Sequence, residues 1–137
     1  MPIEEASRDV DWKDFEGLVA EILESKNFEV IRNFRMRKPT MEIAVVGRHL
    51  GTAILVDCKH WKRMSNSALE KIVLKQIDRV KHYVETTNEN MAAPVIVTLY
   101  QETIKFVNRV PIVPIMQFSS FIDEFYGSLE DIRIVKK

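Results

Sequence analysis

The stretch from Pro39 to Arg63 reads PTMEIAVVGRHLGTAILVDCKHWKR and contains two runs typical of β-strands. MEIAVVG (41–47) and TAILVDC (52–58) are rich in β-branched residues, and RHLG (48–51) connects them, so we expect a hairpin. The second run ends in Asp57-Cys58-Lys59. Side chains two positions apart on a strand share a face, so Asp57 and Lys59 would lie together where the strand ends, and Cys58 would point into the core. An acidic residue and a lysine placed in this way form a candidate catalytic pair.

The segments before this stretch predict a helix and a strand. Apolar residues recur at three- and four-residue spacing from Trp12 to Leu23, which indicates an amphipathic helix that Asp9 or Asp11 could cap. Asn27 can adopt the left-handed conformation that ends such a helix. The run FEVIRNF (28–34) then has the composition of a strand.

The segments after it alternate between helix and strand patterns. A long helix is predicted over 66–87, capped by Ser65, Asn66 or Ser67. PVIVTLY (94–100) has the pattern of a strand buried on both faces, and 101–110 that of a short helix. VPIVPIM (110–116) contains two prolines, which suit a sheet edge, and Ser119 or Ser120 could cap a last helix.

This order of elements predicts an α/β fold with a mixed central sheet flanked by helices on both faces. The long helix would join the strands 52–58 and 94–100 as a parallel crossover. The chain has 137 residues and no low-complexity linker, so we expect one domain over 1–137. No apolar run is long enough for a membrane span, and the acidic N-terminal residues lack an apolar signal core, so the sequence predicts a cytoplasmic protein.

The net charge of zero hides an uneven distribution of charge along the chain. Residues 1–30 carry three basic and nine acidic side chains, whereas residues 31–82 carry twelve basic and four acidic ones. The basic middle segment is a candidate surface for a polyanion, although a solvated helix and strand face would explain it equally well. The single Cys58 excludes an intramolecular disulfide and cannot by itself form a zinc site.

Two polar residues occupy positions at which the periodicity predicts apolar side chains. Glu16 lies at the edge of the apolar stripe of the first helix, either reaching water or paired with a cation or metal. Gln76 lies inside the stripe of the long helix, so its amide must find partners. It could bond to a strand carbonyl as a core residue, or it could belong to a site.

Together these residues resemble the PD-(D/E)xK nuclease superfamily, and most closely its Mrr-like restriction-endonuclease branch in archaea and bacteria. The resemblance covers about residues 12–115 and rests on the order and spacing of four motifs. These are the F-E pair of WKDFEGLVAEILESKNFEV, the strand Glu42-Ile43-Ala44-Val45-Val46, the D-x-K of LVDCKHWKR, and the Gln and Tyr of QIDRVKHY. The resemblance implies a restriction-endonuclease-like fold and hydrolysis of phosphodiester bonds in DNA with Mg²⁺ (or Mn²⁺).

The resemblance also assigns roles to single residues. Asp57 and the backbone carbonyl of Cys58 would hold the metal, with Glu16 in or near its coordination shell, because hard cations prefer oxygen ligands. Lys59 would position the attacking water or stabilise charge in the transition state, and Gln76 would orient the site or touch the DNA backbone. The expected phosphate contacts are Arg32, Arg35, Arg37, Lys38, His60, Lys62 and Arg63.

Ala44 departs from the family pattern, which places a metal-bridging Asp at this position. Three explanations are open: an engineered Asp→Ala substitution that inactivates an enzyme, a naturally degenerate DNA-binding module, or a replacement carboxylate from Glu42. The third is geometrically poor, although Glu42 would share the face of Ala44.

We therefore expect a DNA endonuclease domain that is inactivated or impaired at Ala44. The alternatives are a Holliday junction resolvase, a non-catalytic DNA-binding module, and an α/β domain without a site. Members of the superfamily often pair to cut both strands, which makes a homodimer an expected arrangement.

Overall fold

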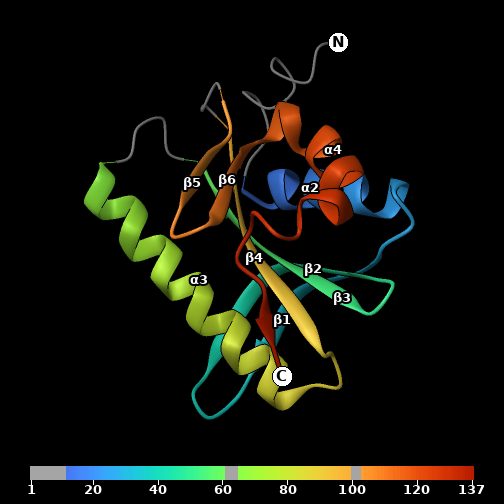
Figure 1. Cartoon of the computed structure of the whole chain (residues 1–137), viewed down its shortest axis with the longest axis vertical. Helices are drawn as coiled ribbons and strands as arrows, with labels where there is room; N and C mark the ends of the chain where they lie inside the picture. The colour runs from blue at the N-terminus through green and yellow to red at the C-terminus, as the bar shows by residue number, and fades with distance from the viewer. Residues whose placement is uncertain (1–11, 61–64, 100–102) are drawn as a thin grey trace.

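The computed structural model describes residues 12–60, 65–99 and 103–137. Within these residues seven strands form one mixed sheet in the order β1-β2-β3-β4-β6-β5, with β7 paired to β4 (Figure 1). The strands are β1 (Glu29–Met36), β2 (Met41–His49), β3 (Thr52–Lys59), β4 (Met91–Thr98), β5 (Lys105–Val107), β6 (Val110–Pro114) and β7 (Val135–Lys136). The predicted α/β class with a mixed central sheet is confirmed.

Helices cover both faces of this sheet. Helix α2 (Trp12–Ser25) and helix α4 (Ile115–Glu124) lie together on one face, and α3 (Asn66–Thr86) crosses the other (Figure 1). A short 3₁₀ helix, η1 (Phe125–Ser128), follows α4. Among the described residues, no helix is both long enough and apolar enough to span a membrane.

The side chains of β3 show how the two faces are divided. Ile54, Val56 and Cys58 belong to the core cluster under α2 and α4. Ala53 and Leu55 belong to a cluster that contains Val80, Tyr83 and Val84 of α3. Successive side chains on a strand point to opposite faces, so Asp57 and Lys59 follow Leu55 onto the α3 face. Cys58 is fully buried, as the sequence predicted.

The predicted hairpin between β2 and β3 is confirmed, and its turn is tighter than RHLG suggested. The strands pair antiparallel as far as His49 and Thr52, which leaves Leu50 and Gly51 as the turn residues. Both have positive φ angles, 52° and 77°, as a two-residue hairpin turn of the favoured twist requires. Asn27 also has a positive φ, 68°, and follows α2 as predicted.

The predicted parallel crossover is confirmed as well. Strands β3 and β4 pair parallel from Thr52 and Met91 to Lys59 and Thr98, and Ser65 caps the intervening helix by accepting from the Ala68 amide at 3.2 Å. Pro94 sits inside this central strand although it lacks an amide hydrogen. On the other edge of β4, pairing passes from β7 at Ala92 to β6 at Ile96. Pro94 lies between these two ladders, where a missing donor costs least.

The short helix predicted over 101–110 is wrong for the part that the structure describes. Residues 105–107 form β5, which pairs antiparallel with β6, and Gln101 and Glu102 lie outside the described residues. Asn108 and Arg109 have φ angles of 51° and 65° and make a second two-residue hairpin turn. An Asn at such a turn was the available signal, and helical periodicity over so short a segment was weak evidence against it.

Two further expectations about the C-terminal region are wrong. Strand β6 lies between β4 and β5 and is not a sheet edge. Pro111 precedes the first residue that pairs with β4 and Pro114 ends the strand, so neither interrupts that ladder. The last helix begins at Ile115, directly after Pro114, because proline's fixed φ suits the residue before a helix. Ser119 and Ser120 therefore lie within α4 and do not cap it.

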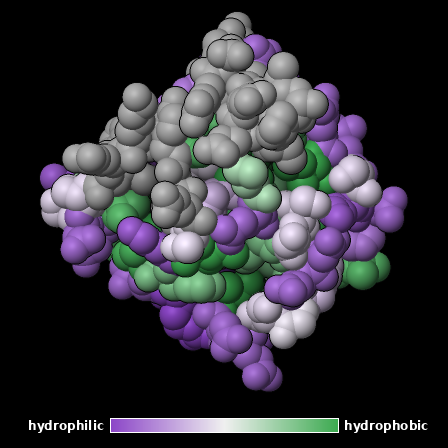
Figure 2. Space-filling view, turned by 90° about the horizontal axis from the view of Figure 1, so that it is seen from above, coloured by the Kyte–Doolittle hydropathy of each residue, from purple (hydrophilic) through white to green (hydrophobic). Residues whose placement is uncertain are grey.

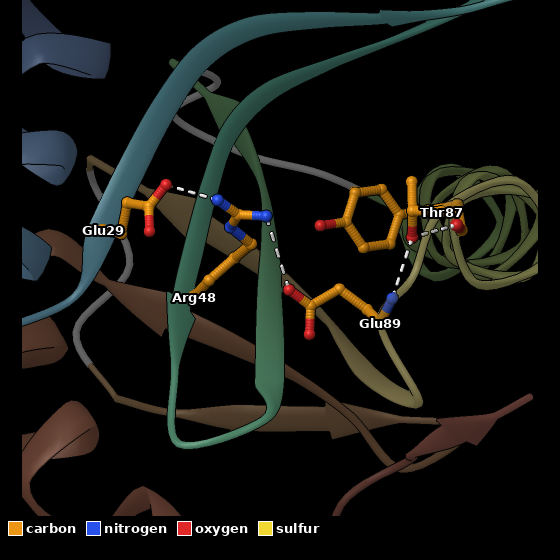
Figure 3. Close-up of polar contacts among 5 residues, drawn as sticks. Glu29, Arg48, Thr87 and Glu89 are labelled. Carbon is orange, nitrogen blue, oxygen red and sulfur yellow. Dashed lines mark hydrogen bonds and ion pairs between the residues drawn. The ribbon is translucent and has the colours of Figure 1, made fainter.

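A cluster of polar side chains ties β1, β2 and the end of α3 together (Figure 3). It lies at the opposite end of β3 from the Asp57–Lys59 pair, because Arg48 registers with Ala53. Arg48 of β2 forms an ion pair with Glu29 of β1, and its Nη1 lies 3.7 Å from Oε1 of Glu89. Thr87 donates its hydroxyl to the Tyr83 carbonyl at 2.7 Å and accepts from the Glu89 amide at 3.4 Å. Burial, and then the charge of Glu89, raises the pKa of Tyr83. This cluster fixes the α3–β4 connection to the outer strands of the sheet.

The hairpin turn provides a test of this backbone description. Leu50 is 78% exposed and adopts a left-handed conformation, which costs about 1–2 kcal/mol for most side chains. Leu50→Asn should therefore raise the free energy of unfolding by about 1 kcal/mol, measured by urea denaturation. Leu74→Asn is the matched control, because Leu74 is exposed on α3, where Asn has a lower helix propensity. Destabilisation by both substitutions would contradict the assigned turn.

Candidate functional site

The predicted pair of Asp57 and Lys59 is assembled at the end of β3. Nζ of Lys59 lies 3.3 Å from Oδ2 of Asp57, and the two side chains are 22% and 12% exposed. The pair sits at the carboxyl ends of the parallel strands β3 and β4, where sheets of this kind commonly bind ligands. A carboxylate with so little exposure to water requires nearby cations, and Lys59 supplies one.

Gln76 links this pair to α3. Its side chain is fully buried, and its Nε2 donates a hydrogen bond to the Leu55 carbonyl at 2.8 Å. Its Oε1 accepts a hydrogen bond from Nη1 of Arg79 at 2.9 Å, and the same nitrogen lies 4.0 Å from Oδ2 of Asp57. Gln76 is therefore a core amide bonded to a strand carbonyl, one of the two readings that the sequence left open. It also holds Arg79 beside the carboxylate.

Two buried oxygens on the α3 face have no aligned hydrogen bond within the described residues. One is Oδ2 of Asp57, whose contacts with Lys59 and Arg79 are ionic, and the other is Oγ1 of Thr98. Thr98 is the register partner of Lys59 on β4 and is 1% exposed. Buried polar atoms are normally satisfied, so these two mark a place where a ligand, water or ion could bind.

Ala44 lies where β2 separates from β3. The registered β2–β3 ladder begins at Val45 and Val56, and one further step would place Ala44 across from Asp57. The β1–β2 ladder also skips Ala44 and its expected partner Asn33, which has a φ of 54°. Ala44 is half-buried and packs against the core cluster under α2. The strand is thus locally irregular at the position where the family pattern has its central carboxylate.

Glu16 approaches from the other face of the sheet. It belongs to α2, is 5% exposed, and is near enough to Cys58 to influence its thiol. The pKa of Cys58 is raised well above its ordinary value by burial, then by the charges of Asp57 and Glu16, while Lys59 and Arg32 lower it. The candidate residues therefore surround Cys58 at the end of β3, with Glu16 and Asp57 on opposite sides of the strand.

The metal ligands that the resemblance implies are only partly assembled. Within the described residues, no group of three or more His, Cys, Asp or Glu side chains could hold a metal ion. The Asp57 carboxylate has an oxygen free of aligned hydrogen bonds, which fits a metal ligand. The resemblance expects a further carboxylate at position 44, where this chain has Ala44.

The predicted phosphate contacts fall into three groups. Arg32 and Arg35 on β1 and Arg37 and Lys38 in the β1–β2 turn are exposed. His60 is half-buried, and its ring packs edge-on against Phe15 of α2 at 5.2 Å, away from the α3 face. Lys62 and Arg63 lie outside the described residues, as do Trp61 and the expected helix caps Asp9 and Asp11.

Sequence reasoning missed Arg79 and Thr98 as members of the site. Arg79 follows Gln76 by three residues, so the two share a helix face, and a buried Gln with a nearby Arg was a usable signal. Thr98 was hidden in an apolar strand, and only its parallel register with Lys59 brings it to the site. Figure 2 looks onto this end of the molecule and shows hydrophilic residues around a strip of hydrophobic ones.

The fold and the D-x-K pair at a strand end define the class of restriction-endonuclease-like nuclease domains. The family model described as a restriction endonuclease domain, Mrr_cat, matches residues 7–106. The chain belongs to this family, which confirms the Mrr-like resemblance.

One sequence relative and two solved structures illustrate what this chain is similar to. An uncharacterized protein from Archaeoglobus fulgidus is 27% identical over 124 residues, which cover 88% of this chain and 95% of the relative. The crystal structure of the small subunit of a heterodimeric restriction endonuclease matches with a TM-score of 0.56 at 14% identity, covering 95% of this chain and 78% of that one. A protein of unknown function matches with a TM-score of 0.50 at 24% identity, over 64% of this chain and 47% of its own length.

The bridging role of Gln76 predicts a loss of stability when its amide is removed. Gln76→Leu should lower the free energy of unfolding by about 1–3 kcal/mol, because the Arg79 guanidinium would lose its buried acceptor. Urea denaturation measures the change. Lys81→Leu, at an exposed position of the same helix, should change stability by less than about 0.5 kcal/mol. Equal effects of the two substitutions would contradict the bridge.

The burial of Cys58 predicts that its thiol is unreactive in the folded protein. Because its pKa is raised, the folded protein holds the thiol proton more tightly than the unfolded chain does. The contribution of Cys58 to stability should therefore decline as the pH rises above the ordinary thiol pKa. A thiol reagent at mildly alkaline pH should label Cys58 only after denaturant is added, with Cys58→Ala as the blank. Rapid labelling of the native protein would refute this placement.

Proposed function

We propose that the chain is a metal-dependent DNA endonuclease domain that hydrolyses phosphodiester bonds, and that Ala44 impairs its activity. The observation that carries the proposal is the cation-flanked carboxylate of Asp57, which retains a buried oxygen without an aligned hydrogen bond at the end of β3. Family membership supports a nuclease, and the exposed basic residues of β1 support a polyanionic substrate.

The donor set fits a hard cation if position 44 supplies a carboxylate. Asp57, the Cys58 carbonyl and a carboxylate at position 44 would hold Mg²⁺ or Mn²⁺, with Glu16 near this shell. A divalent ion in such a site neutralises charge on the scissile phosphate and activates water.

The other residues act on the phosphate and on Asp57. The Lys59 ammonium is placed to stabilise negative charge developing on the phosphate oxygens, or to hold the attacking water through a hydrogen bond. Arg79, held by Gln76, lies beside the Asp57 carboxylate and helps to fix its direction. Gln76 is thus a positioning residue that acts through Arg79 and the β3 backbone.

The three explanations of Ala44 differ in what they require of Glu42. That residue is exposed, and its register partner on β1 is Arg35 rather than a residue of β3. This placement gives less support to Glu42 as the replacement ligand than to a missing carboxylate, whether engineered or natural.

A single domain over 1–137, a cytoplasmic location and a homodimer remain predictions.

Restoring the carboxylate tests the proposal directly. Ala44→Asp should increase the rate of plasmid nicking with Mg²⁺ or Mn²⁺ at least about a hundredfold, because the missing ligand would complete the charge-stabilising site. Ala44→Asn is the matched control, since it has nearly the same size and shape without the charge. Titration calorimetry should show that Ala44→Asp binds Mn²⁺ more tightly than the unchanged chain does, and that Ala44→Asn does not.

Further variants separate the remaining explanations. In the Ala44→Asp background, Asp57→Asn and Lys59→Met should abolish nicking. If the chain with Ala44 already cleaves and Glu42→Gln abolishes that activity, Glu42 is the replacement ligand. Cleavage restricted to branched DNA would favour the resolvase alternative. If the Asp variant cleaves neither duplex, single-stranded nor branched DNA, catalysis is rejected.

A further inference from the structure

We propose that one flank of α3, formed by Lys71, Lys75, Arg79 and His82, is a phosphate-binding surface that guides the DNA backbone to Asp57. This surface is called the basic flank below. The inference rests on the proposed function, since it takes DNA as the partner, and it adds residues that the sequence reasoning left unassigned.

Helical geometry places these four side chains together. At 100° per residue, positions 71, 75, 79 and 82 fall within about 80° of one another, adjoining the buried face that contains Gln76. The first three follow each other at four-residue spacing, about 6 Å apart along the helix axis. Glu70, Lys81 and Glu85 fall on the opposite flank. Of the acidic residues of α3, Asp78 comes closest, at the outer margin of the basic flank.

Two contacts show which part of the sheet the basic flank adjoins. Arg79 reaches Oδ2 of Asp57 at 4.0 Å. A ring nitrogen of His82, Nε2, lies 2.9 Å from the Arg37 carbonyl in the β1–β2 turn. The basic flank therefore runs beside the candidate site and meets the turn that carries the exposed Arg37 and Lys38. The two basic regions form one band of positive charge that passes Asp57.

The charge of this band is not neutralised at its N-terminal end. Lys71 and Lys75 are exposed, and neither has an ion-pair partner in the part of the chain that the structure describes. Like charges at four-residue spacing repel each other and destabilise a helix. A DNA backbone bound along this flank would offset that repulsion. It would also pass beside Asp57, where the proposed function needs the scissile phosphate to lie.

The alternative explanation is that these lysines form only a solvated surface. The two explanations differ in the salt dependence of DNA binding. A lysine that contacts a phosphate releases counterions, so its removal makes the dependence of binding on salt shallower. If the lysines contribute only net charge, removing two of them should change DNA binding and its salt dependence equally, wherever on the surface they lie.

The test compares two double variants of the full chain with Ala44 retained. Lys71→Gln/Lys75→Gln removes two charges from the basic flank, and Lys81→Gln/Lys136→Gln removes two exposed charges from elsewhere. Fluorescence anisotropy of a labelled mixed-sequence duplex, without divalent metal, gives the dissociation constant over a range of NaCl concentrations. Circular dichroism and thermal unfolding confirm that both variants fold.

We expect the Lys71/Lys75 variant to bind about tenfold more weakly at low salt, with a slope of log K against log salt shallower by about 2. The control should keep the slope of the unchanged chain. Equal changes in both variants, or no change in either while the unchanged chain binds, would overturn this inference and leave the proposed function standing. If the unchanged chain binds no duplex, single-stranded or branched DNA, the proposed function fails and the inference fails with it.

Discussion

The half-buried carboxylate of Asp57 is the constraint around which this end of the molecule is organised. A carboxylate with little access to water is unfavourable unless cations and fixed dipoles compensate for the lost hydration. Lys59 on the same strand and Arg79 on α3 provide that compensation. Arg79 is itself held by Gln76, and Gln76 is held by the Leu55 carbonyl. The position of the Asp57 side chain therefore depends on how α3 docks against β3.

Helix α3 joins this site to a second polar cluster at the other end of the sheet. Tyr83 lies seven residues after Gln76, close to the Arg48–Glu89 ion pair. The sequence motif that contains both residues therefore serves two regions: Gln76 orders the candidate site, and Tyr83 packs where β1 and β2 are tied to the α3–β4 connection. Polar contacts at both ends restrict sliding of the helix over an otherwise apolar interface.

The sequence predicted those parts of the fold in which local pattern and packing agree. The β2–β3 hairpin, the parallel crossover and the burial of Cys58 follow from alternation, turn residues and helix periodicity. The β5–β6 hairpin was missed because three residues form too short a strand for a periodic signal, and β7 is shorter still. Thr98 and Arg79 were missed for a different reason. Their relation to Lys59 and Asp57 depends on the register between strands and on the docking of a helix, neither of which a linear pattern specifies.

Ala44 is compatible with this fold because the backbone at that position does not depend on its side chain. Neither neighbouring ladder registers Ala44, and its small side chain packs against the cluster under α2. In the described structure the Ala44 side chain lies on the α2 face, whereas Asp57 lies on the α3 face beside Arg79. A carboxylate at position 44 would therefore need a shift of the irregular β2 backbone, or a cation near the strand end, to act together with Asp57. The contacts that support Asp57, from Lys59 and Arg79, thus form without any contribution from position 44. Carboxylates gathered around a metal site repel one another when the metal is absent, so a fold that positions Asp57 without a second carboxylate avoids the stability cost that active sites usually carry.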